Sequence, residues 1–126
     1  MNNLNRLYWL KKEIAQIENQ IKELTVLSAN SMNGMPKGGE VSSSVERFYE
    51  KLEKLKIKLQ VKMEEYIAEK EQIEEYIELI TDAEIRVIAR ARYIENKTFE
   101  QIGKELHMDR TTAYKKLKRY TKGDKT

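Results

Sequence analysis

The stretch of sequence that decides the fold is residues 98–120, which read TFEQIGKELHMDRTTAYKKLKRY. It opens on Thr98 and, three residues later, Gln101, the spacing of a capping box in which each side chain bonds the other residue's backbone amide. Hydrophobic residues then follow at helical spacing, at Phe99, Ile102 and Leu106. The pattern predicts a short helix over residues 99–106 that buries one face.

A sharp turn is expected directly after this helix. His107 stands where the chain leaves the helix, a place that favours left-handed backbone, which Gly, Asn and His tolerate best. Gly103, in the helix interior, costs roughly 1 kcal/mol relative to alanine, and we expect it there because a neighbouring helix approaches closely. Asp109 is placed to cap a last helix over residues 110–120. Two short helices joined in this way have the form of a helix-turn-helix.

The last helix has two different faces. Its apolar stripe consists of Ala113, Leu117 and Tyr120. The opposite face has cations and hydroxyls and no carboxylate, as a helix needs to enter the major groove of DNA. The candidate DNA-contacting residues on this face are Arg110, Thr111, Tyr114, Lys115 and Lys118, and Arg119, late in the helix, is placed with Lys118 for phosphate contact.

Another helix is predicted before this pair. The run Thr81-Asp82-Ala83-Glu84 has the form of a second capping box and predicts a helix that continues to about Tyr93. Its apolar residues form two stripes, one of Ile85, Ile88 and Ala89 and one of Val87, Ala91 and Ile94. A helix that is apolar on two sides is expected to lie between two neighbours.

The first 80 residues have the pattern of two long helices. Leu and Ile alternate three and four residues apart, as in the seam of a coiled coil, at Leu7, Leu10, Ile14, Ile17, Ile21 and Leu24. This predicts a helix over residues 3–27 and a flexible loop over residues 28–44, where Ser, Asn, Gly and the one proline gather. A second helix, opened by Ser43 or Ser44, covers residues 45–80. We expect a long antiparallel, coiled-coil-like hairpin in residues 1–80.

The lengths of these two helices indicate how the hairpin is completed. At 1.5 Å per residue the first is about 37 Å long and the second about 54 Å. The end of the second helix is therefore left uncovered, and its stripe of Ile73, Tyr76, Ile77 and Ile80 must meet the C-terminal domain or another protomer. We expect a homodimer or higher oligomer through these helices. Trp9 is expected to be a packing anchor, with a ligand platform as the alternative.

The charges are unevenly distributed. Residues 1–80 hold 12 Lys and Arg against 14 Asp and Glu, whereas residues 81–126 have a net charge of +5. Between Arg110 and Lys122 there are six basic residues and no acidic one. A basic C-terminal end of this kind fits a polyanionic partner such as double-stranded DNA.

Several classes of function are disfavoured by composition. With no cysteine and one histidine, the chain lacks the ligands of the usual zinc sites, and no metal or other cofactor is expected. The serines at 42–44 have no recognisable activating base, and Gly38-Gly39 lacks the lysine and hydroxyl of a phosphate loop, so no enzyme is expected. No signal peptide or membrane helix is recognisable, and we expect a cytoplasmic protein.

The residues from Ile80 onward resemble a known family. The strings ITDAEIRVIARARY and TFEQIGKELHMDRTTAYKKL are similar to region 4 of the sigma-70 factors, over about 40 of the 126 residues. With its helical N-terminus, the chain resembles the ArpU and RinA group of phage and prophage late-gene transcription regulators. The resemblance implies an all-α fold with a helix-turn-helix domain in residues 81–126. It places the DNA-contacting positions on Arg110, Thr111, Thr112, Tyr114, Lys115 and Lys118.

One position departs from this family pattern. Lys116 stands where many such helices bury an aliphatic residue, and we expect Leu117 to take over that packing.

Three functions remain open on the sequence alone. The favoured one is a DNA-binding regulator that dimerises through its N-terminal helices and contacts the major groove with residues 110–120. The second is a sigma-like accessory that binds RNA polymerase. The third is a phage structural or packaging protein such as a small terminase subunit.

Overall fold

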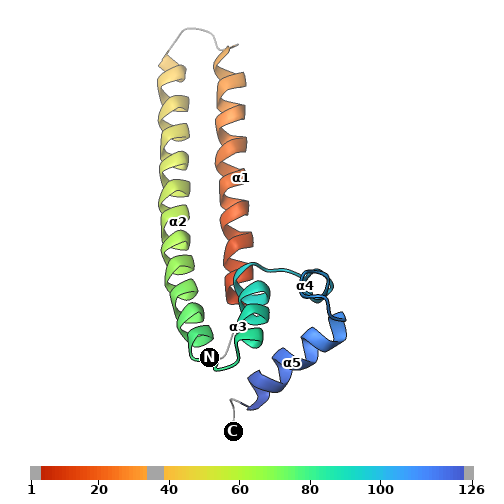
Figure 1. Ribbon diagram of the computed structural model, residues 1–126. Helices are drawn as coiled ribbons and strands as arrows, with labels where there is room; N and C mark the ends of the chain where they lie inside the picture. The colour runs from red at the N-terminus through yellow and green to blue at the C-terminus, as the bar shows by residue number, and fades with distance from the viewer. Residues whose placement is uncertain (1–3, 34–38, 124–126) are drawn as a thin grey trace. The chain divides into compact units, whose positions relative to one another are not determined.

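The computed structural model describes residues 4–33 and 39–123, and within these ranges the chain is helical and forms no strand. Figure 1 shows the helices in order: α1 (Arg6–Asn33), α2 (Gly39–Glu78), α3 (Ala83–Ala89), the π-helix η1 (Arg90–Ile94), α4 (Phe99–Leu106) and α5 (Arg110–Gly123). The predicted all-α class is confirmed. None of the described helices is both long enough and apolar enough to cross a membrane.

The chain divides into two compact units. One consists of residues 10–66, and the other combines the N-terminal segment up to Trp9 with residues 67–126. We call them the long-helix unit and the C-terminal unit. Both α1 and α2 therefore contribute residues to each unit.

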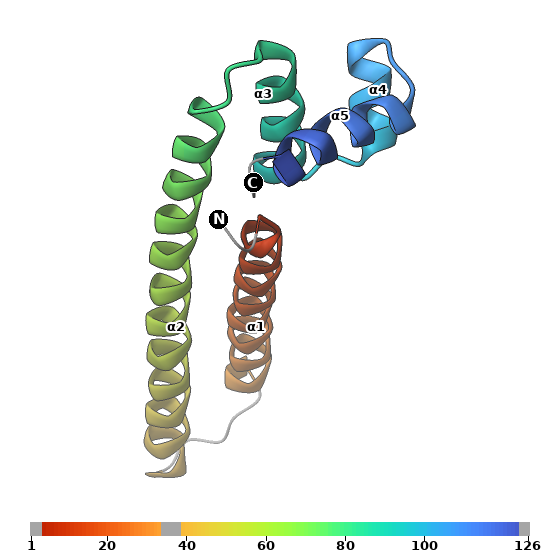
Figure 2. The same cartoon turned by 90° about the horizontal axis from the view of Figure 1, so that it is seen from below.

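In the long-helix unit, α1 and α2 lie side by side and run in opposite directions (Figures 1 and 2). Leu10 and Ile17 of the predicted seam are buried, and its other positions in this unit, Ile14, Ile21 and Leu24, are half-buried. On α2 the residues Leu52, Leu55 and Leu59, which repeat at heptad spacing, are also half-buried. Lys62 pairs with Glu13 across the two helices at 3.2 Å. The heptad spacing thus identifies the residues at which these helices are least exposed.

The predicted boundaries of the two long helices are wrong. Residues 28–33 continue α1, and α2 begins at Gly39, so that Ser43 and Ser44 lie inside the helix and do not cap it. Residues 28–33 contain no Gly or Pro, and extending an existing helix costs little once it is nucleated. Of the predicted flexible loop, residues 34–38 lie outside the described part of the chain.

The start of α3 also differs from the prediction. Its N-cap is Asp82, whose Oδ1 accepts hydrogen bonds from the amides of Glu84 at 2.8 Å and Ile85 at 3.4 Å. The predicted Thr81–Glu84 capping box is therefore wrong: the cap lies one residue later, and the residue three positions after it, Ile85, cannot bond back to the cap. The reason lies at the end of α2, where the Leu79 and Ile80 amides bond carbonyls three residues back and the chain turns into α3 one residue later than expected. Asp serves as a cap as well as Thr does.

The core of the C-terminal unit contains the stripe that the long helices left uncovered. Ile73, Ile77 and Ile80 of α2 are all buried within this single chain, so the stripe requires no second protomer. Arg90, the first residue of η1, ties this helix to α2 through ion pairs with Glu74 at 3.3 Å and Glu78 at 3.0 Å. The other buried hydrophobic residues of this unit are Leu7, Ile88, Ala89, Ala91, Ile102, Ala113 and Leu117.

The helix predicted to continue to about Tyr93 does so, but it changes its hydrogen-bond pattern. Its last turn is the π-helix η1, closed by the Glu95 amide on the Arg90 carbonyl at 3.0 Å. Asn96 follows with φ of 59°, a left-handed conformation that ends the helix. On the second predicted stripe Ala91 is buried, Ile94 is half-buried and Val87 stays exposed.

Candidate nucleic-acid interface

The predicted capping box at the start of α4 is confirmed. The Gln101 amide donates to Thr98 Oγ1 at 3.1 Å, and the Thr98 amide donates to Gln101 Oε1 at 2.9 Å. The helix covers residues 99–106, the range predicted from sequence. Ile102 and Gly103 are buried on its inner side, while Phe99 and Leu106 are half-buried.

The turn between α4 and α5 is fixed by two residues. His107 has φ of 57° and ψ of 47°, the predicted left-handed conformation, and the Met108 amide bonds the Gly103 carbonyl at 2.9 Å. A Cβ on Gly103 would lie 2.5 Å from the Met108 carbonyl oxygen and 3.1 Å from the Arg110 amide nitrogen. The prediction of a close approach at Gly103 is confirmed, and the approaching group is the backbone that leads into α5.

Helix α5 packs against both α3 and α4. Ala113 and Leu117 are buried and Tyr120 is half-buried, as the sequence predicts. Lys116 is half-buried, and its ammonium forms an ion pair with Glu84 in the first turn of α3. Leu117 therefore supplies the packing, and Lys116 fastens α5 to α3.

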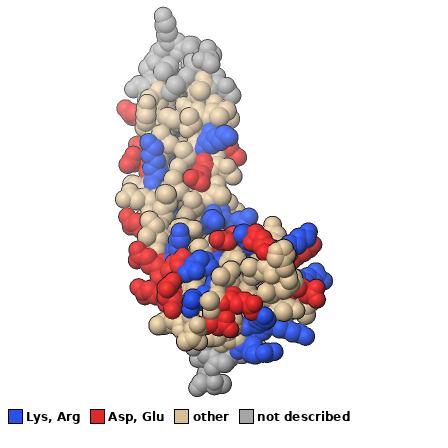
Figure 3. All heavy atoms as spheres, viewed as in Figure 1, with Lys and Arg blue, Asp and Glu red and all other residues tan. Residues whose placement is uncertain are grey.

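The predicted contact residues of α5 mostly share one exposed surface. Thr112 is half-buried, and the others are exposed: Arg110, Thr111, Tyr114, Lys115, Lys118 and Arg119. The first turn of α5 holds no acidic residue. In Figure 3, blue Lys and Arg side chains gather over α5 at the lower right, whereas red carboxylates gather over the last turns of α2 at the lower left.

A row of stacked side chains connects this surface to η1. The Arg92 guanidinium lies 4.6 Å from the centre of the Phe99 ring, and Phe99 meets Tyr114 edge to face at 5.3 Å between ring centres. The Lys118 ammonium lies 5.8 Å from the centre of the Tyr114 ring. Contacts of these kinds each contribute on the order of 1 kcal/mol. They hold Tyr114 in a defined position on the exposed face of α5.

The segment between η1 and α4 is held by charged groups. Arg92 Nη1 donates to the Lys97 carbonyl at 3.0 Å, and the Lys97 ammonium pairs with Glu105 at 2.9 Å and Glu95 at 3.1 Å. The hydrogen bond that the Lys97 ammonium donates to Glu105, followed by the one it donates to Glu95, raises the pKa of Lys97 above its usual value. Burial raises the pKa of Tyr93, against the opposing effect of the Arg92 charge. At neutral pH the lysine is therefore a cation and the tyrosine is neutral.

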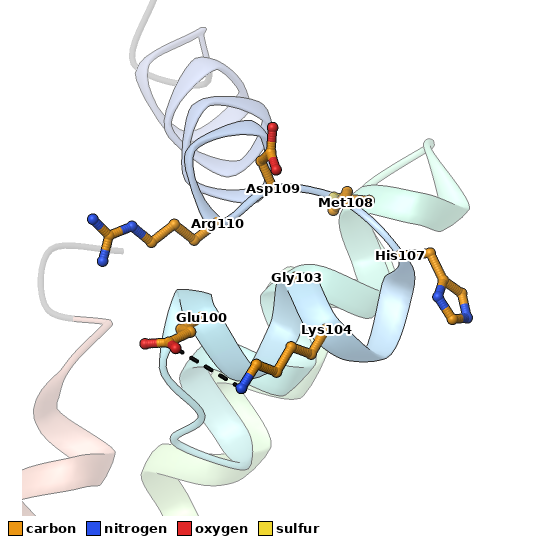
Figure 4. A pocket seen from close by; sticks show the side chains of 7 residues that line it. All are labelled: Glu100, Gly103, Lys104, His107, Met108, Asp109 and Arg110. Carbon is orange, nitrogen blue, oxygen red and sulfur yellow. Dashed lines mark ion pairs between the residues drawn. The ribbon is translucent and has the colours of Figure 1, made fainter.

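A shallow, open hollow lies around the turn (Figure 4). It is lined by Glu100, Gly103, Lys104, His107, Met108, Asp109 and Arg110. Figure 4 shows Arg110 and His107 pointing away from each other on either side of the turn, with Lys104 paired to Glu100 at 3.9 Å. Acidic and basic groups alternate here, so the hollow has no single charge to attract an ion. Nowhere in the described residues do three or more metal-ligating side chains gather.

Two features of the C-terminal unit differ from the prediction or were not predicted: the exposure of Trp9 and the stacking of Arg92, Phe99 and Tyr114. Trp9 was expected to pack, yet 61% of it is exposed, because the seam of Leu7, Leu10 and Ile14 leaves position 9 on the outer side of α1. That spacing alone predicts that Trp9 is exposed. The stacking of Arg92, Phe99 and Tyr114 joins three elements, and helical periodicity within each element does not predict it.

Comparison with known proteins gives a family without an assigned activity. No curated protein and no solved structure matches the chain. One family model, described as "Protein of unknown function (DUF1492)", matches residues 25–123. The matched range includes the last nine residues of α1 and all of α2, α3, η1, α4 and α5. Because the match covers well over half of its residues, the chain belongs to the DUF1492 family.

Proposed function

We propose that this protein is a sequence-specific DNA-binding transcription regulator of phage or prophage type, which contacts the major groove through α5. The observation that carries the proposal is the exposed surface of α5, which presents six cations and hydroxyls and no carboxylate, mounted on α4 through a tight left-handed turn. This arrangement has the form of a helix-turn-helix, in which the second helix enters the groove.

The contact residues divide by position along α5. Arg110, Thr111, Tyr114 and Lys115 lie early in the helix, where side chains of a reading helix contact base edges. Lys118 and Arg119 lie later and supply charge to the phosphates. Thr112, being half-buried, contributes to packing more than to contact. Lys116 is not among the proposed DNA contacts, because its ammonium is paired with Glu84.

The positioning of α5 supports reading more than loose electrostatic binding. A base contact requires a helix held in a fixed orientation, because hydrogen bonds lose strength steeply when their angles change. Here Gly103 lets the backbone of the turn lie close to α4. The Lys116–Glu84 pair ties α5 to α3, and the Phe99 ring contacts the ring of Tyr114.

We further propose that two copies associate through the long-helix unit. In this unit large hydrophobic side chains remain exposed on both helices, among them Val26, Leu27, Tyr49, Ile57 and Val61. A dimer would bring two copies of α5 to one DNA molecule. It would then contact two half-sites in place of one, which raises sequence specificity. Light scattering at tens of micromolar should give twice the chain mass or more. A strict monomer would remove this part of the proposal.

The proposal is tested by footprinting on DNA that flanks the protein's own gene, with and without RNA polymerase. A regulator that binds DNA by itself should protect a defined site without polymerase. In a companion binding assay, Lys118→Ala and Arg119→Ala should each lower the slope of log affinity against log salt by about 0.9. Lys104→Ala is the control, since this lysine is on α4 and pairs with Glu100. Absence of protection under both conditions would contradict the proposal.

A sigma-like accessory that binds polymerase is the second candidate, and one observation favours it. A small groove between α3, η1 and α4 is lined by the apolar residues Val87, Ala91, Ile102 and Leu106 together with the charged residues Arg90, Glu95 and Glu105, and Val87 is exposed there. An exposed apolar side chain surrounded by charged ones suits a protein partner, because protein interfaces combine an apolar centre with a polar rim. In the footprinting experiment this candidate predicts protection that appears only when polymerase is present.

A further inference from the structure

A second hollow lies in the C-terminal unit, away from the turn. It has a volume of about 490 Å³ and is lined by Asn5, Tyr8, Trp9, Arg92, Asn96 and Thr98. The start of α1 supplies one wall, and the segment from η1 to the cap of α4 supplies the other. We call it the Trp9 hollow.

The aromatic wall of this hollow is unusually exposed. Trp9 is 61% exposed, and its ring meets that of Tyr8 edge to face at 5.0 Å between ring centres. An indole offers a large apolar face, so Trp9 can contribute contact area to a molecule that covers the hollow. The indole N–H is then available as a hydrogen-bond donor.

The polar groups of the hollow indicate what covers it. None of the six lining residues has a carboxylate, and all six can donate hydrogen bonds, from amides, hydroxyls, an indole and a guanidinium. Arg, Asn, Thr and Tyr side chains are among the groups that contact the sugar–phosphate backbone of DNA.

The Trp9 hollow is continuous with the surface of α5. Arg92 lines the hollow and at the same time lies over the Phe99 ring, which meets Tyr114, beside which lies Lys118. Thr98 lines the hollow and caps the N-terminus of α4, where the helix dipole also favours a negative charge. A DNA strand lying along the exposed face of α5 would pass next to the hollow.

We propose that the Trp9 hollow binds the phosphate backbone of the DNA strand that flanks the base pairs contacted by α5. This inference rests on the proposed DNA-binding function and adds a second contact to it, made by the first residues of α1. The hollow contributes affinity and footprint length, and it contributes no base preference, because phosphates are the same at every position.

The experiment uses the full chain and the fluorescence of Trp9, which is its one tryptophan. A duplex with the binding site and long flanks, and two duplexes trimmed on one side or the other, are titrated while labelled DNA reports binding by anisotropy. Acrylamide quenching reports how accessible the indole remains. We expect quenching to fall when the long duplex saturates the protein. Trimming one particular flank should restore quenching while sequence-specific binding persists.

Two variants complete the test. Trp9→Ala should bind the long duplex about fivefold more weakly, the equivalent of one hydrogen bond of about 1 kcal/mol, and should bind the correctly trimmed duplex as the wild type does. Leu79→Ala is the matched control, since Leu79 is exposed in the same unit and does not line the hollow. It should bind both duplexes unchanged.

The outcomes separate this inference from the function on which it rests. If the long duplex binds specifically but quenching of Trp9 stays the same, or if Trp9→Ala binds as tightly as Leu79→Ala, the hollow is not a DNA contact and the proposed function stands. If no duplex binds in the anisotropy assay, the proposed function is wrong and the inference is overturned with it.

Discussion

The substitution Gly103→Ala tests whether the turn is packed as tightly as the structure indicates. The added Cβ would lie 2.5 Å from the Met108 carbonyl oxygen and 3.1 Å from the Arg110 amide nitrogen, and both are backbone atoms that cannot rotate away. Overpacking costs about 1–3 kcal/mol, and a contact this short with backbone lies in the upper part of that range, at about 2–3 kcal/mol. Alanine regains about 1 kcal/mol through its better helix propensity. We therefore expect a net loss of about 1–2 kcal/mol in the free energy of unfolding.

Thermal unfolding followed by circular dichroism measures this loss. For a chain of this size it corresponds to a fall in Tm of about 4–10 °C. The control is Lys104→Ala, at the next residue in α4, where the side chain is mostly exposed. This substitution removes only a surface ion pair, which contributes about 0.5 kcal/mol or less. If Gly103→Ala melts at the wild-type temperature or above it, the close approach of the turn to α4 is refuted.

Three further predictions concern the C-terminal unit. Thr98→Ala removes one half of the capping box and should destabilise the fold by about 1 kcal/mol, measured by urea unfolding, whereas Thr98→Ser should be close to the wild type. His107→Gly should raise stability by up to about 1 kcal/mol in the same assay, because glycine adopts the left-handed conformation without strain; a loss would indicate that the imidazole makes a needed contact. Because burial raises the pKa of Tyr93 in the folded state above 10.0, the unfolded chain gives up this proton first. The stability it contributes is therefore complete below about pH 10 and declines as pH rises through the raised folded pKa. Tyr93→Phe should show a smaller alkaline fall in Tm than the wild type, and equal falls would contradict the assignment.

Local rules predicted the α4–α5 region well from sequence. The capping box of Thr98 and Gln101, the bounds of α4 and the left-handed His107 depend on residues within four positions of one another. Such short-range preferences are set by the local backbone and by hydrogen bonds that need no distant partner. The exposure of most of the contact residues on α5 followed from the same periodicity.

The sequence predicted the structure less well where a feature depends on residues far apart in the chain, or where two adjacent residues can each cap the same helix. Asp82 and Thr81 are both good caps, and the end of α2 decided between them. The sequence left open what covers Ile73 and Ile77, and the rest of the C-terminal unit does so. The Arg92–Phe99 stack was not predicted because the two residues belong to different elements.

The central claim is that α5 reads base sequence, and selection of bound sites from a random DNA pool tests it most directly. The wild type should enrich one defined motif. Arg110→Ala and Lys115→Ala should relax the preference at the positions they contact, each by about 1–3 kcal/mol of discrimination for a good bidentate contact. Lys118→Ala should bind more weakly and enrich the same motif. If the wild type enriches no motif, or if Arg110→Ala and Lys115→Ala keep the wild-type preference, α5 is not the reading helix.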